Sequence, residues 1–245
     1  MWKWFYKLAS PPFVYNTAAA LIPWFTSFAV VALGYGLVGG LVFAPPDYQQ
    51  GDAFRIIYVH VPSAWMSEFS YTLMAVAGAI ALIWRIKIGH AVAAATAPIG
   101  ASFTVLALVT GSMWGRPMWG TYWAWDPRLT SELILLFLYF GVMSLRTAFE
   151  EDGPRGDRAA ALLSIVGVVN IPIIHYSVVW WNSLHQAASV AKFGKPTIEP
   201  SMLWPLLAMF LGFMLFFGAV LCLRLQGEIL GRERQSAWVR DAVKS

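Results

Sequence analysis

Long apolar runs separated by short polar segments make up most of the chain. A helix rises about 1.5 Å per residue, so about 20 apolar residues are needed to cross the roughly 30 Å hydrocarbon core of a bilayer. Six runs reach that length, near residues 19–44, 63–84, 92–113, 128–146, 160–182 and 202–224. The pattern predicts an all-α integral membrane protein with six transmembrane helices, which form one domain over residues 1–245.

The composition supports a membrane protein rather than a soluble one. Hydrophobic residues make up 58% of the chain and charged residues only 12%, against roughly 45–50% and about 25% in soluble domains. Such a chain has too little polar surface to cover a water-soluble domain, so membrane lipid is an expected partner. In this setting the net charge of +4 reports topology and does not predict binding of nucleic acid.

Lysine and arginine residues are unequally divided between the two sides of the predicted bundle. Twelve lie in the terminal segments and in the loops after the second and fourth helices, and five lie on the other side. Positive residues accumulate on the cytoplasmic side of membrane proteins. We therefore expect both termini in the cytoplasm, with a C-terminal tail at about 225–245, and the loops 45–62, 114–127 and 183–201 outside.

The loop between the third and fourth helices is unusually rich in tryptophan. Residues 114–126 read WGRPMWGTYWAWD and include Trp114, Trp119, Trp123 and Trp125. An aromatic belt at the membrane surface explains one or two tryptophans per helix end, and explains four in one loop poorly. Trp119 and Trp123 are four residues apart, so a short helix would place both on one apolar face. Such a face suits stacking against a planar conjugated ligand.

Two histidines are expected at the external surface, on different helices. His60 lies at the start of the second helix, and His185 lies just beyond the end of the fifth. Neutral imidazole is a common metal ligand, and paired imidazoles bind haem iron, so the two could face each other across a flat ligand. The alternative is that each histidine simply lies at the membrane interface. Of the other two, His90 falls in a cytoplasmic loop and His175 inside the fifth span.

Polar residues flank the tryptophan-rich loop. Asp126 precedes Pro127, a pair typical of the N-cap and first residue of a helix. Three external arginines, Arg55, Arg116 and Arg128, lie near the His60 segment or in this loop. A guanidinium fork fits a carboxylate in a bidentate way, so these arginines could hold haem propionates, with lipid phosphates as the alternative ligand.

The run WGRPMWGTYWAWD, the six spans and one external histidine on each side resemble the WWD-domain haem-handling proteins of bacterial cytochrome c maturation. The resemblance covers essentially the full length and is to the haem exporter protein C family. It implies that His60 and His185 are axial ligands of haem b, bound non-covalently. It also implies that the four tryptophans and Asp126 present the haem to the next carrier. Tyr122 stands before Trp123 where some relatives have a second tryptophan, which keeps an aromatic face.

The resemblance implies partners and a location as well. Haem would pass to the periplasmic haem chaperone CcmE, the ATPase pair CcmA and CcmB would power release, and the small membrane protein CcmD would join the complex. The protein would lie in the bacterial inner membrane with its haem site facing the periplasm. The sequence contains no phosphate-binding loop, so we expect a haem-transfer component rather than an enzyme.

A membrane cytochrome b-type redox subunit that carries two haems is the alternative function. Such a subunit would need four histidines, paired by helix and buried across the membrane. Only His175 is clearly inside a predicted span. The haem stoichiometry distinguishes the two functions, since a haem-transfer protein would bind one haem per chain and the redox subunit two.

Overall fold

The computed structural model describes residues 7, 9–149, 152–185 and 198–242. The described residues form helices and no β-strand. Six of the helical segments are long and apolar enough to cross a membrane, which confirms the predicted six-span architecture. Their bounds are Pro11–Phe43, Asp52–Trp84, Lys87–Trp119, Pro127–Ala148, Gly153–Trp180 and Pro200–Arg232.

Three of these segments contain more than one helical element. The first is α2 (Pro11–Val38) continued by a π-helical turn, η1 (Gly39–Phe43), and the second is a 3-10 turn, η2 (Asp52–Ile56), followed by α3 (Ile57–Trp84). The third and fourth segments are α4 (Lys87–Trp119) and α5 (Pro127–Ala148). The fifth is divided into α6 (Gly153–Gly167) and α7 (Asn170–Trp180). The sixth is α8 (Pro200–Arg232), and the short α9 (Ala237–Ala242) follows it.

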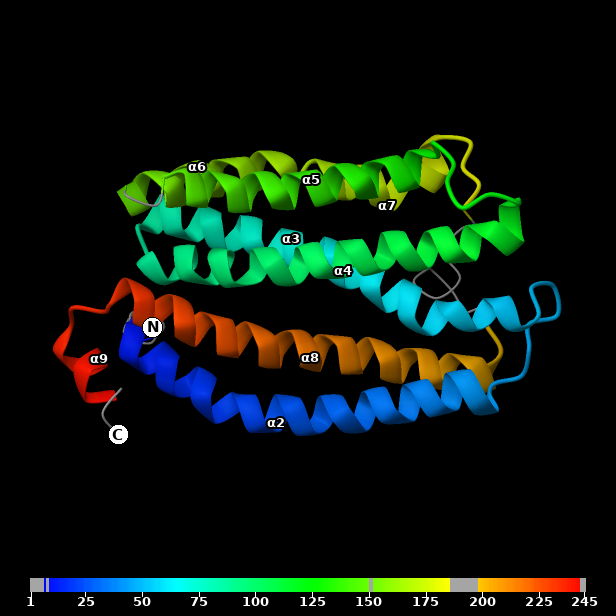
Figure 1. The fold of residues 1–245 in the computed structure, drawn as a ribbon, viewed down its shortest axis with the longest axis horizontal. Helices are drawn as coiled ribbons and strands as arrows, with labels where there is room; N and C mark the ends of the chain where they lie inside the picture. The colour runs from blue at the N-terminus through cyan, green and yellow to red at the C-terminus, as the bar shows by residue number, and fades with distance from the viewer. Residues whose placement is uncertain (1–6, 8, 150–151, 186–197, 243–245) are drawn as a thin grey trace.

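The helices lie in layers (Figure 1). The central layer is the pair α3 and α4, which packs against α5 and α6 on one side and against α8 on the other. The outer layer beyond α8 is α2, and α7 packs on α5. The turns after η1, α4 and α7 lie together at one end, and the α3–α4 and α5–α6 connections lie with α9 at the opposite end (Figure 1). We call these the loop end and the tail end.

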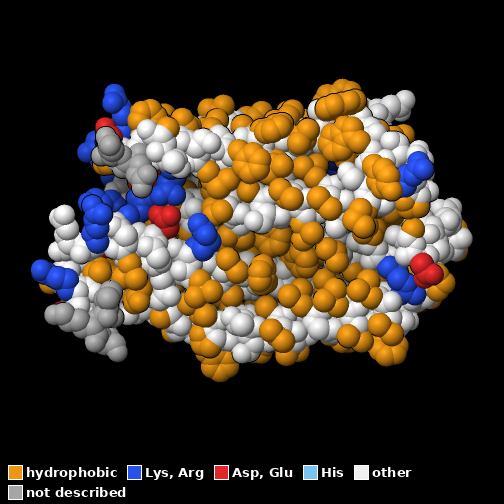
Figure 2. Space-filling view, viewed as in Figure 1, with side chains coloured by type: hydrophobic (Ala, Val, Ile, Leu, Met, Phe, Trp, Pro, Cys, Tyr) orange, Lys and Arg blue, Asp and Glu red, His pale blue; other side chains and the backbone are white. Residues whose placement is uncertain are grey.

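Two apolar clusters hold the layers together. One cluster joins α3, α4 and α8 through residues such as Phe103 and Leu206. The other cluster contains residues of α3, α4, α5, α6 and α7 and is centred on the edge-on pair Tyr71 and Tyr139, whose ring centroids are 5.0 Å apart. Outward-facing side chains are also apolar, and they cover the middle of the molecule (Figure 2). A soluble protein cannot present such a surface to water, whereas a bilayer solvates it.

The helices extend beyond the apolar runs from which they were predicted. α4 continues to Trp119, so Trp114 and Trp119 lie on a helix rather than in a loop, and α8 continues through residues 225–232 of the predicted tail. Gly120 ends α4 with a positive φ of 78°, and residues 120–126 are not helical. The predicted short helix with Trp119 and Trp123 on one face is therefore wrong. Hydropathy marks where the lipid ends, and a helix continues until a residue stops it.

The fifth span is interrupted between Gly167 and Asn170. Pro172 has no N–H and its ring would collide with the carbonyl four residues earlier, that of Val168, so a regular helix cannot pass this point. The break orients the buried Asn170 towards α5, where its side-chain amide donates to the carbonyl of Ser131 at 2.9 Å. α7 therefore runs on to the loop end in a direction fixed by α5.

Candidate functional site

The two external histidines of the sequence prediction come together at the loop end. His60 lies in the first turn of α3 and His185 lies four residues after Trp181, where α7 has ended. Both line two adjoining cavities of about 30 and 110 Å³. The deeper cavity is lined by His60, Ala64, Glu68, Ala107, Leu108, Gly111, Arg128, Leu129, Glu132 and His185. The outer cavity is lined by Gln50, His60, Gly111, Trp114, Gly115, Met118, Trp119, Leu184 and His185.

The His60 ring is oriented by α4. Its Nδ1 lies 3.1 Å from the carbonyl oxygen of Ala107 and 3.1 Å from Oγ1 of Thr110, whose hydroxyl already donates to the carbonyl of Leu106. Both partners of Nδ1 act as acceptors, so Nδ1 carries the hydrogen and Nε2 keeps its lone pair. Gly111 leaves room for the ring, because a Cβ there would lie 2.9 Å from Cε1 of His60. The result is an imidazole whose orientation is fixed by α4.

The His185 ring is oriented by Asp126. Nδ1 of His185 lies 3.3 Å from Oδ1 of Asp126, close enough for an electrostatic contact but too poorly aligned for a hydrogen bond. Burial, with a smaller contribution from the Arg128 guanidinium, lowers the pKa of His185 to about 4. His185 is therefore neutral at pH 7, as a metal-binding imidazole must be.

Asp126 holds the His185 segment in place as well as capping α5. Oδ1 accepts from the Arg128 N–H at 2.9 Å, which confirms the predicted N-cap. Oδ2 accepts from the Ser183 hydroxyl at 2.8 Å and from the Leu184 N–H at 2.7 Å. Burial raises the pKa of Asp126, but these hydrogen bonds outweigh it and keep the pKa below its ordinary value. One carboxylate thus ties the start of α5 to the segment that carries His185.

α4 supplies one indole to each histidine. Trp114 lies edge-on to His60 with ring centroids 5.6 Å apart, and Trp119 lies edge-on to His185 at 4.9 Å. The indole N–H of Trp114 donates to Oε1 of Gln50 at 2.9 Å, which fixes its ring. Because α4 extends to Trp119, both indoles are on a rigid helix and both line the outer cavity.

The other predicted site residues lie elsewhere. Trp123 and Trp125 contact each other edge-on at 5.5 Å, line neither cavity, and Trp125 is 77% exposed. Arg55 lines neither cavity either, since its guanidinium contacts Asp52 at 3.0 Å and the Gly40 carbonyl at 2.9 Å. Arg128 is the arginine that lines the deeper cavity with both histidines. Its position as a propionate ligand remains a prediction.

Two glutamates of the deeper cavity were missed from the sequence. Glu132 accepts from the Ser67 hydroxyl at 2.6 Å, and Oε2 of Glu68 lies 3.9 Å from Nδ1 of His175. Tyr139 donates to the carbonyl of Ser67 at 2.8 Å and so completes a polar network inside the bundle. A signal was present, because acidic residues inside an apolar span are rare and usually functional.

The donor set fits haem iron, but the space between the histidines is narrow. Two neutral imidazoles with oriented rings, edge-on indoles and one arginine at the same place are ligands of the kind that haem uses. The two cavities, at about 30 and 110 Å³, are well below the roughly 300–1,000 Å³ of ligand pockets. A haem bound at this place would therefore need more space than the two cavities offer.

Known proteins similar to this chain are haem-handling proteins. The family model for heme exporter protein C, CcmC, matches residues 4–240. A heme exporter protein C of Haemophilus influenzae is 49% identical over 245 residues, which cover 100% of this chain and 99% of the relative. One from Bradyrhizobium diazoefficiens is 46% identical and covers 97% of this chain and 89% of the relative. A Marchantia polymorpha protein, named as a ccmC-like mitochondrial protein of cytochrome c biosynthesis, is 44% identical over 76% of this chain and 78% of its own length.

Proposed function

The chain belongs to the heme exporter protein C family, a multi-pass membrane family of haem export and cytochrome c maturation, and we propose that it binds one haem b non-covalently between His60 and His185. The family establishes a haem-handling role. The proposal adds which residues bind the haem iron, on which side of the membrane the haem lies and which proteins receive it or assist its release.

The observation that carries the proposal is the common orientation of the two imidazoles. Each has Nδ1 next to an acceptor, the Ala107 carbonyl for His60 and the Asp126 carboxylate for His185, and both rings line the same cavities. In this arrangement Nε2 of each ring would be available to iron, and the hydrogen bond at Nδ1 of His60 would raise the basicity of that ligand. Trp114 and Trp119 would lie beside the haem, and Arg128 would face a propionate.

Handover to a carrier is favoured by where the ligands are attached. His60 is on the rigid α3, whereas His185 is on an irregular segment held by Asp126. Movement of this segment would open the site at the loop end. The exposed Tyr122 and Trp125 lie in the neighbouring turn and offer an aromatic surface for a docking partner. A haem bound there would supply a vinyl group for covalent capture by the acceptor histidine of the carrier.

We propose the carrier and the location from the family context. The loop end faces the periplasm of a bacterial inner membrane, and the carrier is the haem chaperone CcmE. CcmA and CcmB supply ATP hydrolysis for release, and CcmD joins the complex. The charge distribution supports this orientation, since most lysine and arginine residues fall at the tail end or in segments next to it.

An absorption spectrum with a chemical haem assay on the detergent-purified protein tests the proposal. We expect about one haem per chain for the native form and loss of haem or an altered spectrum for His60→Ala and for His185→Ala. His175→Ala is the matched control, because His175 contacts Glu68 and Trp65 and lines neither cavity. If both site variants kept the native spectrum, the ligand assignment would be wrong.

The same assay tests the redox-subunit alternative. Two haems per chain, with one lost in His175→Ala or His90→Ala, would favour the cytochrome b-type function. The positions of these two histidines give that function no support, because His90 lies in the first turn of α4 at the tail end and His175 lies in α7.

A further inference from the structure

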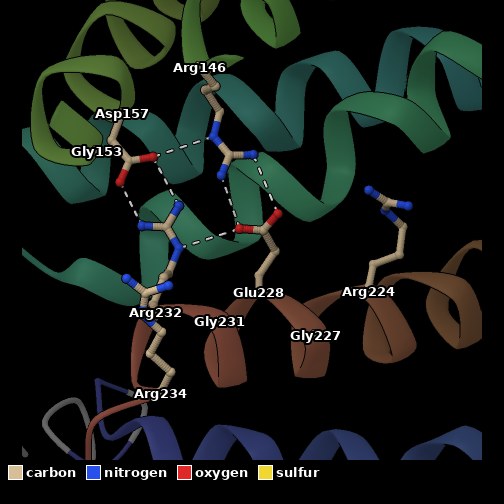
Figure 3. Close-up of a pocket in the computed structure, with 9 residues that line it drawn as sticks. All are labelled: Arg146, Gly153, Asp157, Arg224, Gly227, Glu228, Gly231, Arg232 and Arg234. Atoms are coloured by element: carbon tan, nitrogen blue, oxygen red, sulfur yellow. Dashed lines mark hydrogen bonds and ion pairs between the residues drawn. The ribbon is translucent and has the colours of Figure 1, made fainter. Parts of the chain in front are cut away.

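The tail end holds two large cavities that the haem site does not use. One has a volume of about 620 Å³ and lies between α8 and the α5–α6 connection (Figure 3). The other, of about 850 Å³, adjoins it and extends to the start of α4. The two share Gly153, Asp157 and Arg232, so they form one continuous depression, which we call the tail cavity.

Two of the three acidic residues of the tail cavity, Asp157 and Glu228, are already paired. Asp157 contacts Arg232 at 2.6 Å and Arg146 at 3.5 Å, and Glu228 contacts the same two arginines at 3.4 and 3.0 Å (Figure 3). These four side chains form a closed ring of opposite charges. The ring satisfies both carboxylates and leaves them no capacity for a further cation.

Four other arginines line the tail cavity without a described carboxylate partner, and two of them, Arg224 and Arg234, lie in the part shown in Figure 3. Arg224 donates from Nε to the carbonyl of Ala95 at 3.2 Å, and its two terminal nitrogens extend away from the ring (Figure 3). Arg234 lies two residues beyond Arg232 on the chain. Neither Arg224 nor Arg234 makes an ion pair with a carboxylate in the described part of the chain. Each presents a guanidinium edge to the cavity.

Arg224 lies deeper along the membrane axis than the ring. It precedes Arg232 by eight residues of one helix, which is about 12 Å at a rise of about 1.5 Å per residue. Its neighbour Leu223 is 53% exposed and faces the apolar surface. An arginine at this depth is costly unless an anion or a polar group accompanies it, and a single carbonyl uses only one of its five N–H groups.

The whole tail cavity is strongly positive. Its lining contains seven cationic side chains, Arg85, Lys87, Arg146, Arg158, Arg224, Arg232 and Arg234, and three carboxylates, Asp157, Glu228 and Glu233. The ligand that complements it is therefore an anion. No phenylalanine, tyrosine or tryptophan is among the described residues that line it, and its one ring is the imidazole of His90, so the cavity lacks the indole and phenyl surfaces on which a planar ligand such as haem would stack.

Glycines keep the cavity open. Gly153, Gly227 and Gly231 line it, and a Cβ added to any of the three would meet no atom within 4 Å. Close packing therefore does not require glycine at these positions. Larger side chains there would instead project into open space next to Arg224 and Arg232.

We propose that the tail cavity binds the phosphate headgroup of an anionic phospholipid from the adjacent leaflet. Guanidinium groups bind phosphate oxygens in a bidentate way, and basic pockets between transmembrane helices bind anionic lipid headgroups. A free phosphate offers the same oxygens. The lipid is favoured because the cationic cluster borders directly on the apolar surface of the helices, where acyl chains can lie (Figure 2). The unpaired Arg224 extends to that border.

Thermal unfolding in detergent tests the proposal with defined lipids. Cardiolipin or phosphatidylglycerol, added at the same molar ratio as phosphatidylcholine, should raise the apparent Tm by about 2–4 °C for each 1 kcal/mol of linked binding. Native mass spectrometry should show the anionic lipid retained on the protein. Inorganic phosphate at the same concentration should give no shift. A shift with phosphate equal to that with the lipids would identify a free-anion site and overturn the proposal.

Variants separate this site from general surface charge. Arg224→Gln combined with Arg234→Gln should abolish the lipid-dependent shift, whereas Arg155→Gln should retain it, because Arg155 is exposed and pairs with Asp152 outside the cavity. Gly231→Leu keeps every arginine, favours the helix and fills the cavity, so it should also abolish the shift. Circular dichroism and size-exclusion chromatography report whether each variant is folded, independently of haem binding. An unchanged shift in folded Gly231→Leu, or a loss in Arg155→Gln equal to that in the double variant, would refute the site.

Discussion

The two ends of the bundle are built for opposite chemistry. At the loop end, two neutral imidazoles and two indoles surround narrow cavities of about 30 and 110 Å³. At the tail end, seven cations and three carboxylates line a depression of about 620 and 850 Å³ in its two parts. The loop end suits a ligand that coordinates to uncharged nitrogen, and the tail end suits an anion held by charge. The helices α4 and α5 run between the two ends, and each lines cavities at both of them.

The largest effect on haem affinity is expected for Asp126, because this side chain contacts His185 and also holds the segment before it. Asp126→Ala should lower haem affinity by about 10–100-fold, because it removes the acceptor beside the metal-ligand histidine and frees the Ser183–Leu184 segment. The measurement is haem titration followed by absorption. Glu199→Ala is the matched control, since Glu199 is the N-cap of α8 and accepts from the Ser201 N–H without contacting a histidine.

Both variants lose a helix cap, which costs about 0.5–2 kcal/mol of stability. Only Asp126→Ala should lose haem. Equal haem loss in the two variants would mean that Asp126 acts through helix stability alone, and the comparison between a ligand-positioning carboxylate and a simple cap would fail.

The next largest effect on haem binding is expected from a comparison of two glycine variants, one at each end of the bundle. Gly111→Ala places a Cβ 2.9 Å from Cε1 of His60, so the imidazole must turn, and we expect a shifted absorption spectrum with about tenfold weaker haem binding, equivalent to about 1.4 kcal/mol. Gly227→Ala adds the same methyl group where nothing lies within 4 Å and should leave the haem spectrum unchanged. An unchanged spectrum in Gly111→Ala would show that the His60 position is not critical.

A smaller effect is expected within the tryptophan-rich segment itself. Trp119→Phe should weaken haem binding by about 2–10-fold, since an aromatic pair contributes about 0.5–1.5 kcal/mol and Trp119 lies edge-on to His185. Trp125→Phe should leave haem affinity unchanged, because Trp125 is exposed and lines neither cavity. Trp125→Phe should instead slow transfer to the purified chaperone. Equal effects of both variants on haem affinity would favour one continuous haem-binding face along the segment.

These contrasts show which features could be predicted from the sequence. Hydrophobic length predicts the six spans, and residue type predicts the two histidines, since both signals are local. The roles of individual tryptophans and arginines depend on where helices end. Trp114 and Trp119 contact the histidines because α4 continues to Gly120, and Trp125 does not because the chain then turns.

Arginine positions depend on the same kind of non-local detail. Arg128 follows the N-cap of α5 and lines the deeper cavity, whereas Arg55 turns back to the carbonyl of Gly40, 15 residues away in the chain. No spacing rule in the sequence separates the two. Glu68 and Glu132 differ from the arginines, because the sequence alone shows that each carboxylate lies inside an apolar span. Since such residues are usually functional, both glutamates could have been predicted as site residues.

The smallest expected effect is that of mild acidification, and it tests why the His185 imidazole is uncharged. Burial lowers the pKa of His185 to about 4 in the folded protein, against about 6.5 in an unfolded chain. A depressed histidine pKa contributes stability above about pH 6.5 that is lost as the pH falls towards 4.

At pH 5.5 the folded imidazole is still almost entirely neutral, so haem affinity should change less than about twofold between pH 7.5 and 5.5. An exposed histidine with a pKa of about 6.5 would be protonated in about nine of ten molecules at pH 5.5. Haem affinity would then fall about tenfold between pH 7.5 and 5.5. A haem titration at the two pH values distinguishes these outcomes, and a tenfold loss at pH 5.5 would mean that His185 is solvated rather than enclosed by Asp126 and Trp119.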